Sequence, residues 1–242
     1  MRAIIQSLLG KAGYEILSKD RCSLVPRTSM SQAIHWLREQ QISVNTVLDV
    51  GASDGRWSRE CMDEYPDATY ILFEPQPVHS QALDAFVRSS EGRVDVVKKA
   101  VGGENGHLSF DVSDPLGGGP ATEESKEIME VELTTIDSAV EQVGSTGPFL
   151  LKLDTHGIEK SILDGSVQTL KQCEALIIEA YNYRITDEAL LFWELCAYLD
   201  QKGLRCVDLV DVLHREYDNS FWQMDLVFIR SSWAGFDHIK YG

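Results

Sequence analysis

Residues 47–55 read Val-Leu-Asp-Val-Gly-Ala-Ser-Asp-Gly and contain the strongest indication of the fold in this chain. It begins as an apolar run, ends in an Asp-x-Gly sequence at Gly51, and reaches a second small turn residue, Gly55, before a helix-like segment begins. A buried strand that stops at glycine and leads into a helix is typical of parallel α/β sheets, whose ligands bind beyond the carboxyl ends of the strands. The stretch therefore predicts the first strand of such a sheet, with a ligand near Gly51.

A second apolar run, Tyr-Ile-Leu-Phe-Glu-Pro at residues 70–75, ends in a single acid, Glu74. A carboxylate in that place suits two adjacent ribose hydroxyls of a nucleoside. The dinucleotide fingerprint Gly-x-Gly-x-x-Gly is absent here, because Gly51 and Gly55 enclose three residues. A ribose site without a phosphate cradle favours S-adenosylmethionine (SAM), which is cationic at sulfur and carries no phosphate.

Strand-like and helix-like segments alternate along the rest of the chain, which predicts an α/β fold with a doubly wound, mostly parallel sheet. A helix is expected over residues 187–202, where leucines lie on one stripe. The expected strands are 46–50, 69–74, 94–101, 149–154, 175–179 and 205–210, with a last strand at 224–229 that can pair antiparallel.

The chain is expected to divide into an N-terminal helical extension, residues 1–43, and one domain, residues 44–242. Two helices are expected in the extension, the second of them capped by Ser29 or Ser31. Their apolar residues are Ile4, Ile5, Leu8 and Leu9 in the first and Ile34, Trp36 and Leu37 in the second.

An irregular insert follows the third expected strand. Residues 106–112 and 128–133 can each form a small antiparallel strand, and the glycine- and proline-rich residues 113–125 lie between them. Such a loop is either a plain connection or a lid over a site. Both interpretations stay open at this point.

Composition limits the possible partners and the compartment. A net charge of −16 argues against a nucleic-acid partner, because phosphate binding depends on clustered lysine and arginine. No run approaches the ~18 apolar residues of a membrane span, so membrane insertion is not expected. The five cysteines lie ten or more residues apart and favour reduced thiols in a cytoplasmic protein.

Six segments in sequence order resemble the FkbM-type family of SAM-dependent O-methyltransferases, over roughly residues 45–180. The most specific is Lys-x-Asp-x-x-Gly-x-Glu at residues 152–159, where His156 stands in place of the more usual Glu or Gln. In the first segment, Ser53 stands where the family usually has Asn. The six are Asp49–Gly55 (similar to D-V-G-A-N-x-G), Phe73–Pro77 (similar to F-E-P-x-P), Ala100–Gly102, Leu133–Asp137, Leu151–Gly165 and Ile177–Glu179.

The resemblance implies a Rossmann-like class I methyltransferase sheet of seven strands, in the order 3-2-1-4-5-7-6 with strand seven antiparallel. It also implies SAM as the cofactor and transfer of its methyl group to a hydroxyl. The acceptor would be a small molecule or a glycan, such as a sugar or a polyketide-like metabolite.

The residues expected to bind SAM come from the strand ends and motifs. Gly51 would allow close approach of the methionine part, Glu74 would bind the ribose, and adenine would lie near Ala100. The full set is Asp49, Gly51, Ala52, Ser53, Gly55, Glu74, Pro75, Ala100 and Asp154. For Gly55, helix–sheet packing is an equal alternative, and Asp49 can instead cap the helix that follows.

The residues expected to act in catalysis are Lys152, Asp154 and His156. Asp154 ends the fourth strand, and Lys152 lies two residues earlier on the same face. His156 is the candidate general base, because its ordinary pKa is close to neutrality. Asp154, His156 and Glu159 contain metal-binding atoms, but without a second ligand cluster no metal is expected.

Two other functions compete with methyl transfer. A domain of the same fold can bind SAM as a non-catalytic scaffold, which the departures at Ser53 and His156 leave open. A nucleotide-dependent oxidoreductase is the third reading, and the missing phosphate fingerprint argues against it.

Overall fold

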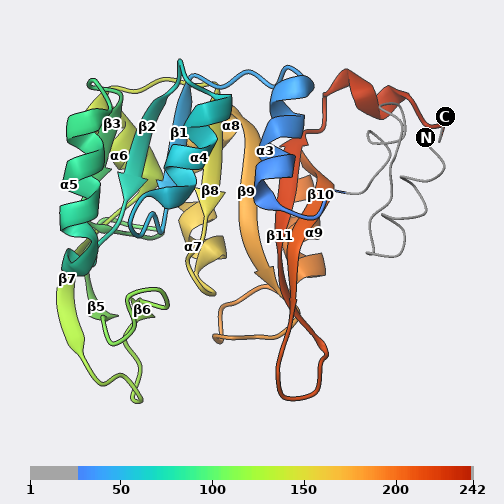
Figure 1. The fold of residues 1–242 in the computed structure, drawn as a ribbon. Coiled ribbons are helices and arrows are strands. Elements are labelled where there is room, and N and C mark those ends of the chain that lie inside the picture. The colour runs from blue at the N-terminus through green and yellow to red at the C-terminus, as the bar shows by residue number, and fades with distance from the viewer. Residues whose placement is uncertain (1–26, 241–242) are drawn as a thin grey trace, which may run out of the picture.

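The continuous apolar runs form the centre of a seven-stranded sheet (Figure 1), in a computed structural model that describes residues 27–240. The order is β10-β11-β9-β8-β1-β2-β3, and only β11 runs antiparallel to its neighbours. Counted within this sheet, it is the 3-2-1-4-5-7-6 order that the resemblance implied, so the expected fold class is confirmed. The strands are β1 (Thr46–Val50), β2 (Thr69–Phe73), β3 (Val94–Val97), β8 (Phe149–Leu153), β9 (Cys173–Tyr181), β10 (Leu204–His214) and β11 (Phe221–Arg230).

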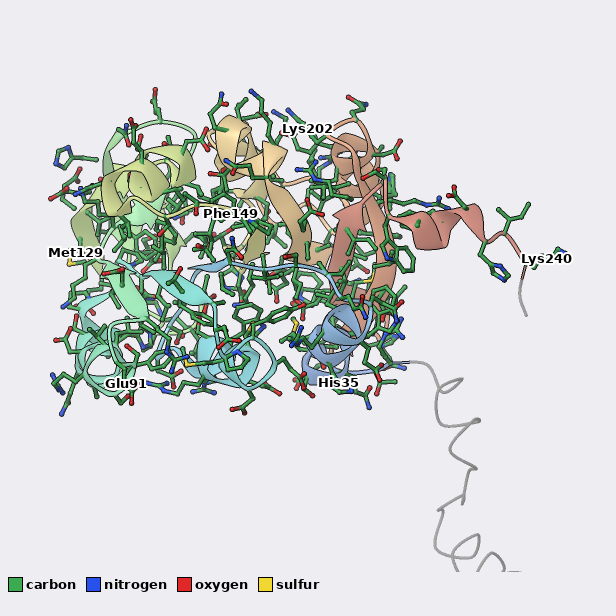
Figure 2. The ribbon with its side chains drawn as sticks, turned by 90° about the horizontal axis from the view of Figure 1, so that it is seen from above. His35, Glu91, Met129, Phe149, Lys202 and Lys240 are labelled. Atoms are coloured by element: carbon green, nitrogen blue, oxygen red, sulfur yellow. The ribbon has the colours of Figure 1, made fainter. Side chains whose placement is uncertain are left out.

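Helices cover both faces of this sheet, as Figure 2 shows with His35 and Lys202 on opposite sides and Phe149 between them. Successive side chains of β1 point to opposite faces of the sheet. Val47 packs against a first group of helices on one face, and Leu48 packs against a second group on the other face. All five residues of β1 and of β8 are buried, which explains their unbroken apolar pattern. The groups are α3 (Met30–Glu39), α4 (Arg56–Glu64) and α5 (Ser80–Ser89), and α6 (Ile136–Val143), α7 (Glu159–Asp164), α8 (Val167–Lys171) and α9 (Phe192–Asp200).

The helix expected after Ser29 is α3, and it is part of the same core as the sheet. Its buried residues Ala33, Ile34 and Leu37 pack in the cluster that contains Val47 of β1. Ser29 occupies the N-cap position without a side-chain capping bond. The boundary predicted at residue 43 stays a prediction, and the helical face predicted within residues 4–9 lies outside the described residues.

The expected strand 94–101 is wrong as one element. It breaks into β3 and β4 (Ala100–Val101), because the chain turns at Lys98 and the amide of Lys99 donates to the Val97 carbonyl at 2.9 Å. β4 joins a second sheet of order β4-β7-β5-β6, which contains the predicted antiparallel pair. The other strands of this sheet are β5 (Gly106–Asp111), β6 (Gly119–Pro120) and β7 (Ile128–Thr134).

The helix expected over 187–202 is shorter, because α9 begins at Phe192. Its first turn is closed by the Glu194 carboxylate, which accepts the Leu191 amide at 2.9 Å, and Leu191 itself forms a bridge to Tyr181. Residues 187–190 are turn and irregular backbone rather than helix. Two short 3₁₀ turns, Pro77–His79 and Ala234–Asp237, complete the described elements.

None of the helices within residues 27–240 has both the length and the apolar character needed to cross a membrane. The four cysteines in that range are free: Cys61, Cys173, Cys196 and Cys206.

The turn after β1 has a geometric constraint that only glycine meets. Gly51 has φ +78°, and a Cβ built on it would lie 2.1 Å from the backbone oxygen of Asp154. The amide of Asp154 in turn donates to the carbonyl of Val50 at 3.0 Å. The ends of β1 and β8 are thus locked backbone to backbone, which leaves no room for a side chain at this position.

We expect Gly51→Ala to lower the free energy of unfolding by more than about 3 kcal/mol, because it adds a backbone overlap to the conformational strain. Gly92→Ala is the matched control, since Gly92 has φ +81° with nothing within 4 Å of its built Cβ. Gly92→Ala should lower the free energy of unfolding only by the conformational strain, about 1–2 kcal/mol. Urea unfolding of both variants measures the difference, and equal losses would contradict the constraint.

Candidate functional site

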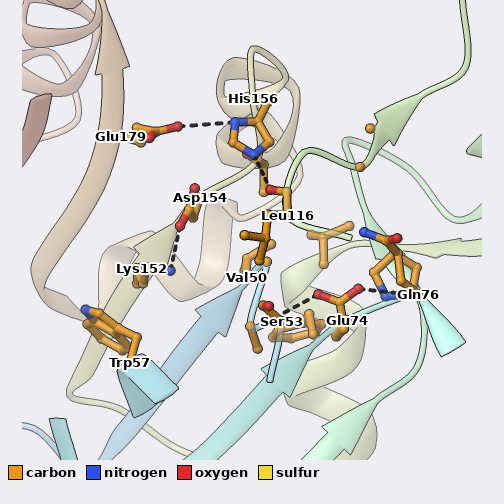
Figure 3. A pocket seen from close by; sticks show the side chains of 18 of the residues that line it. Val50, Ser53, Trp57, Glu74, Gln76, Leu116, Lys152, Asp154, His156 and Glu179 are labelled. Carbon is orange, nitrogen blue, oxygen red and sulfur yellow. Dashed lines mark hydrogen bonds and ion pairs between the residues drawn. The ribbon is translucent and has the colours of Figure 1, made fainter. Parts of the chain in front are cut away.

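A cavity of about 410 Å³ opens at the carboxyl ends of β1, β2, β8 and β9 (Figure 3). This is the edge at which parallel α/β sheets bind ligands. Its lining includes most of the residues that the sequence indicated, from both the cofactor and the catalytic sets: Gly51, Ala52, Ser53, Glu74, Pro75, Ala100, Lys152, Asp154 and His156.

Glu74 is oriented by the backbone at one end of this cavity. Its Oε2 accepts the amide of Ser53 at 2.9 Å, and its Oε1 accepts the amide of Gln76 at 2.8 Å. Burial raises the pKa of Glu74, against the opposing effect of these two hydrogen bonds. Each carboxylate oxygen keeps a further lone pair, so Glu74 can accept two more hydrogen bonds from a ligand.

Two residues predicted to touch the cofactor lie beneath the cavity instead. Asp49 is fully buried and accepts the Ser58 hydroxyl at 2.6 Å. A Cβ on Gly55 would meet side chains of α5 and β2, at 3.0 Å from Phe86, 3.2 Å from Leu83 and 3.4 Å from Leu72. Neither lines the cavity. The contacts of Gly55 agree with the packing alternative. Asp49 does not cap the helix that follows, because the N-cap of α4 is Gly55 without a side-chain capping bond, and Asp49 supports the turn through Ser58 instead.

Lys152 connects the buried Asp49 to Asp154 at the cavity wall. Its Nζ lies 3.5 Å from Asp49 Oδ1 and 3.1 Å from Asp154 Oδ2, with the side chain 7% exposed. Burial alone would lower the pKa of Lys152, but the two carboxylates outweigh it and raise the pKa. The ammonium therefore stays charged and holds Asp154 at the cavity wall.

His156 is held between acceptors on both sides of its ring. Its Nδ1 lies 2.9 Å from the Tyr181 hydroxyl and 3.3 Å from Glu179 Oε2, and its Nε2 lies 3.2 Å from the carbonyl of Leu116. The Tyr181 hydroxyl donates its own proton to Glu179, so it can only accept from the ring. Both ring nitrogens must then be donors, which is the imidazolium form.

The electrostatics agree with that assignment. The hydrogen bond to Glu179 raises the pKa of His156 from 6.5 to about 9, with burial opposing it and the charges of Glu179 and Asp154 adding to it. A general base needs a free ring lone pair, and this arrangement provides none at neutral pH. The base role predicted for His156 is therefore at odds with the observed geometry.

A possible cation site differs from the set that the sequence indicated. Donor atoms of Asp154, His156 and Glu179 lie within 4.8 Å of one another. Glu159 is elsewhere, because its carboxylate accepts the amide of Gly157 at 2.7 Å and the hydroxyl of Thr155. Lys152 pairs with Asp154 and the His156 imidazolium with Glu179, so a metal ion at this position would have to displace both protein cations.

Residues 113–125 cover the cavity. The carbonyl of Pro115 accepts His79 Nε2 at 2.8 Å and Gln76 Nε2 at 3.2 Å, and the carbonyl of Leu116 accepts His156. Gln76 Oε1 is buried and receives no hydrogen bond from any described residue. The loop therefore lies closed over the site, and its opening as a lid stays a prediction.

Both departures from the family pattern have left-handed backbone. Ser53 has φ +49° and His156 has φ +54°, and both line the cavity. A non-glycine residue in this region costs of order 1–3 kcal/mol, and asparagine tolerates it better than serine. Because both strained residues line the cavity, we infer that the site, rather than packing of the core, requires the conformation of these two turns.

Two residues beside Glu179 were not predicted from the sequence as part of the site. Tyr181 lies two residues beyond Glu179 on β9, and Asp225 lies opposite Glu179 in the β9–β11 register. Asp225 is the single charged residue of the predicted strand 224–229, which was the available signal. Its position at the site follows only from the antiparallel pairing.

Comparison with known proteins identifies the domain. Residues 49–206 match the family model described as the methyltransferase FkbM domain. A comparison with curated protein sequences finds no match. Methyltransferase FkbM from Methylobacillus flagellatus is similar in structure, with a TM-score of 0.52, 18% identity, and alignment over 75% of this chain and 43% of that chain. This chain therefore spans less than half the length of that structure, and the likeness shows the fold alone.

Two further solved structures are similar with lower scores. An O-methyltransferase family protein from Burkholderia thailandensis has a TM-score of 0.45 and 14% identity, over 84% of this chain and 55% of that chain. A 1,6-didemethyltoxoflavin-N1-methyltransferase from the same organism has a TM-score of 0.45 and 12% identity, over 83% and 76%.

We expect Lys152→Met to lower the free energy of unfolding by about 3–5 kcal/mol, because it leaves the buried Asp49 carboxylate without its cation. Adding Asp49→Asn in the same chain should recover part of that loss, since the second change removes the unpaired charge. Urea unfolding of the two single variants and the double variant at pH 7 gives the coupling energy. Additive losses would show that the pair is not coupled.

Proposed function

Since the chain belongs to the FkbM methyltransferase family, we propose that it transfers a methyl group from SAM to a hydroxyl of a small-molecule or sugar acceptor. One observation carries this proposal: the backbone-anchored Glu74 carboxylate faces a cavity at the carboxyl edge of a parallel sheet. Two free acceptor positions there suit the paired hydroxyls of a ribose. The negative charge of the chain supports an acceptor that is not a nucleic acid.

The cavity residues fit SAM at the Glu74 end. Glu74 would bind the ribose hydroxyls, and the buried Gln76 Oε1 has an unused acceptor position for an amine such as that of adenine. Ala52, Ser53 and Ala100 leave space along the wall between β1 and β4. SAM supplies an electrophilic methyl carbon on a cationic sulfur.

The acceptor would react on the side of β8 and β9. Its hydroxyl oxygen would gain the methyl carbon as the carbon–sulfur bond breaks and a neutral thioether leaves, and Asp154 or water would take the hydroxyl proton. Alignment of donor and acceptor contributes ~7–11 kcal/mol to such a step, whereas a general base contributes ~10²–10⁴ in rate. We therefore assign Lys152 and His156 to positioning: Lys152 orients Asp154, and His156 orients Glu179 and the covering loop.

We expect Glu74→Gln to weaken SAM binding by about 10- to 100-fold, because a neutral amide loses charge-assisted hydrogen bonds worth about 1.5–3 kcal/mol. Calorimetric titration with SAM and, separately, with NAD measures this and excludes the oxidoreductase reading. Glu141→Gln, on an exposed position of α6, is the control and should bind SAM as the unaltered protein does. NAD binding with no SAM binding would refute the proposed cofactor.

We expect His156→Gln to lower kcat/KM for the acceptor about tenfold at pH 7 while leaving the Kd for SAM unchanged. In the unaltered enzyme, kcat should be level below pH 9 and fall above it, as the imidazolium that holds Glu179 is lost. The same ionisation stabilises the fold below pH 6.5, and this contribution disappears as the pH rises through about 9.

A kcat that rises with pH up to 9, and loses this rise in His156→Gln, would restore the general-base role. SAM binding without methyl transfer to any acceptor would identify the chain as a non-catalytic domain of the same fold.

A further inference from the structure

Beyond Asp154, the cavity is bounded by carboxylates from four strands, which we call the acidic wall: Asp154, Glu179, Asp211 and Asp225. Asp154 follows β8, and the other three lie in β9, β10 and β11 in that order. The wall is therefore on the far side of β8 from Glu74. Figure 3 shows Asp154 and Glu179 on this side, with Glu74 across the cavity. The wall therefore borders the acceptor, on the assumption that SAM binds at Glu74.

Two members of the wall have their charge neutralised by the protein. Lys152 pairs with Asp154, and the His156 imidazolium pairs with Glu179. Glu179 also accepts from Gln223 at Oε1 and from Tyr181 at Oε2, so one acceptor position of Oε1 stays free for a ligand. Asp154 and Glu179 therefore each have a cationic partner among the described residues.

The other two members have no cationic partner among the described residues. Asp211 accepts one backbone amide, that of Met30, at 2.8 Å. No residue in the range 27–240 donates a hydrogen bond to the Asp225 carboxylate or forms an ion pair with it. Burial, and then the charges of Glu179 and Asp154, raise the pKa of Asp225 to about 7, with Lys152 opposing.

An independent observation points to a ligand at the same cavity. Trp57 is 9% exposed and lines the cavity, yet its Nε1 has no hydrogen-bond partner among the described residues. A buried indole N–H normally has a partner, and leaving one unmade costs about 1–3 kcal/mol. The cavity thus contains an unused donor as well as unused carboxylates, which is the pattern of a site built for a polar molecule.

We propose that the methyl acceptor is a small hydroxylated amine whose protonated nitrogen binds the acidic wall between Glu179 and Asp225, and whose hydroxyl receives the methyl group. This inference rests on the proposed function. Glu179 and Asp225 face each other in register, so one ammonium group, with three N–H donors, can serve both carboxylates. An acceptor bearing a carboxylate or phosphate would meet repulsion at the same place.

The same charges decide which atom is methylated. A carboxylate beside an amine favours its protonated form, and a protonated amine has no lone pair with which to attack the methyl carbon. The hydroxyl is then the available nucleophile, so the wall directs methylation to oxygen although the substrate carries nitrogen.

The test is methyl transfer from isotopically labelled SAM into the small molecules of a cell extract by the full chain. After unreacted SAM is removed on charcoal, the labelled product should bind a cation exchanger at pH 5. Its label should be released by hydriodic acid, which cleaves methyl ethers and leaves N-methyl groups. Label in a neutral or anionic fraction, or on nitrogen, would overturn this inference while methyl transfer stands. If no molecule in the extract gains label, the proposed function itself is contradicted.

A variant tests whether Asp225 recognises the positive charge of the acceptor. With the retained acceptor fraction at subsaturating concentration, Asp225→Asn should lower the transfer rate at least tenfold and leave the Kd for SAM unchanged. Its midpoint of thermal unfolding should stay equal or rise, because an unpartnered carboxylate beside Glu179 and Asp154 is removed from a half-buried site. Asp200→Asn, at the end of α9, is the control and should change neither rate nor binding.

Two results would refute the role of Asp225. Weaker SAM binding in Asp225→Asn would assign the acidic wall to the cofactor. Loss of transfer when EDTA is added to the unaltered enzyme, with recovery on adding a divalent ion, would show that a metal rather than an ammonium group occupies the wall.

Discussion

The buried ammonium of Lys152 is the contact on which the geometry of the site depends. It lies between Asp49, inside β1, and Asp154, just beyond β8, and so connects two neighbouring parallel strands by charge. Two carboxylates this close would repel each other in a medium of low dielectric if no cation separated them. The Lys152 ammonium makes their approach favourable. The backbone contact of Asp154 with Gly51 then fixes how far apart the strand ends can lie.

The arrangement also separates two kinds of motif residue. Gly51 and Asp154 shape the cavity surface, whereas Asp49 and Gly55 act one layer below, where they hold the turn and the helix in place. A motif shows that a residue type is needed, but the reason can be contact with a ligand or support for a neighbour. Only the positions of the surrounding atoms distinguish the two, and for Asp49 they show support.

Much of the fold could be predicted because strands buried on both faces must be apolar at every position, as β1 and β8 are. The break between β3 and β4 could not, since the valines on either side of Lys98 have the same strand pattern. The helix over 187–202 was predicted too long, because Leu191, the first leucine of its stripe, forms a bridge to Tyr181 of β9 instead of a helical turn. Glu74 and Asp154 were predictable as acids at strand ends. Tyr181 and Asp225 reach the site through pairing between distant segments, which periodicity does not reveal.

The unused polar groups between Glu74 and the acidic wall are mostly hydrogen-bond acceptors, and this limits what can bind there. Arg56 and Lys99 also line the cavity, but they pair with Asp54 and Glu132. The side-chain donors of Gln76 and His156 are used by carbonyls of the covering loop. Glu74, the side-chain oxygen of Gln76 and Asp225 keep unused acceptor positions, whereas Trp57 is the unpartnered donor that the described residues leave buried. A ligand must therefore bring its own donors. Ribose hydroxyls, an adenine amine and an ammonium group supply such donors.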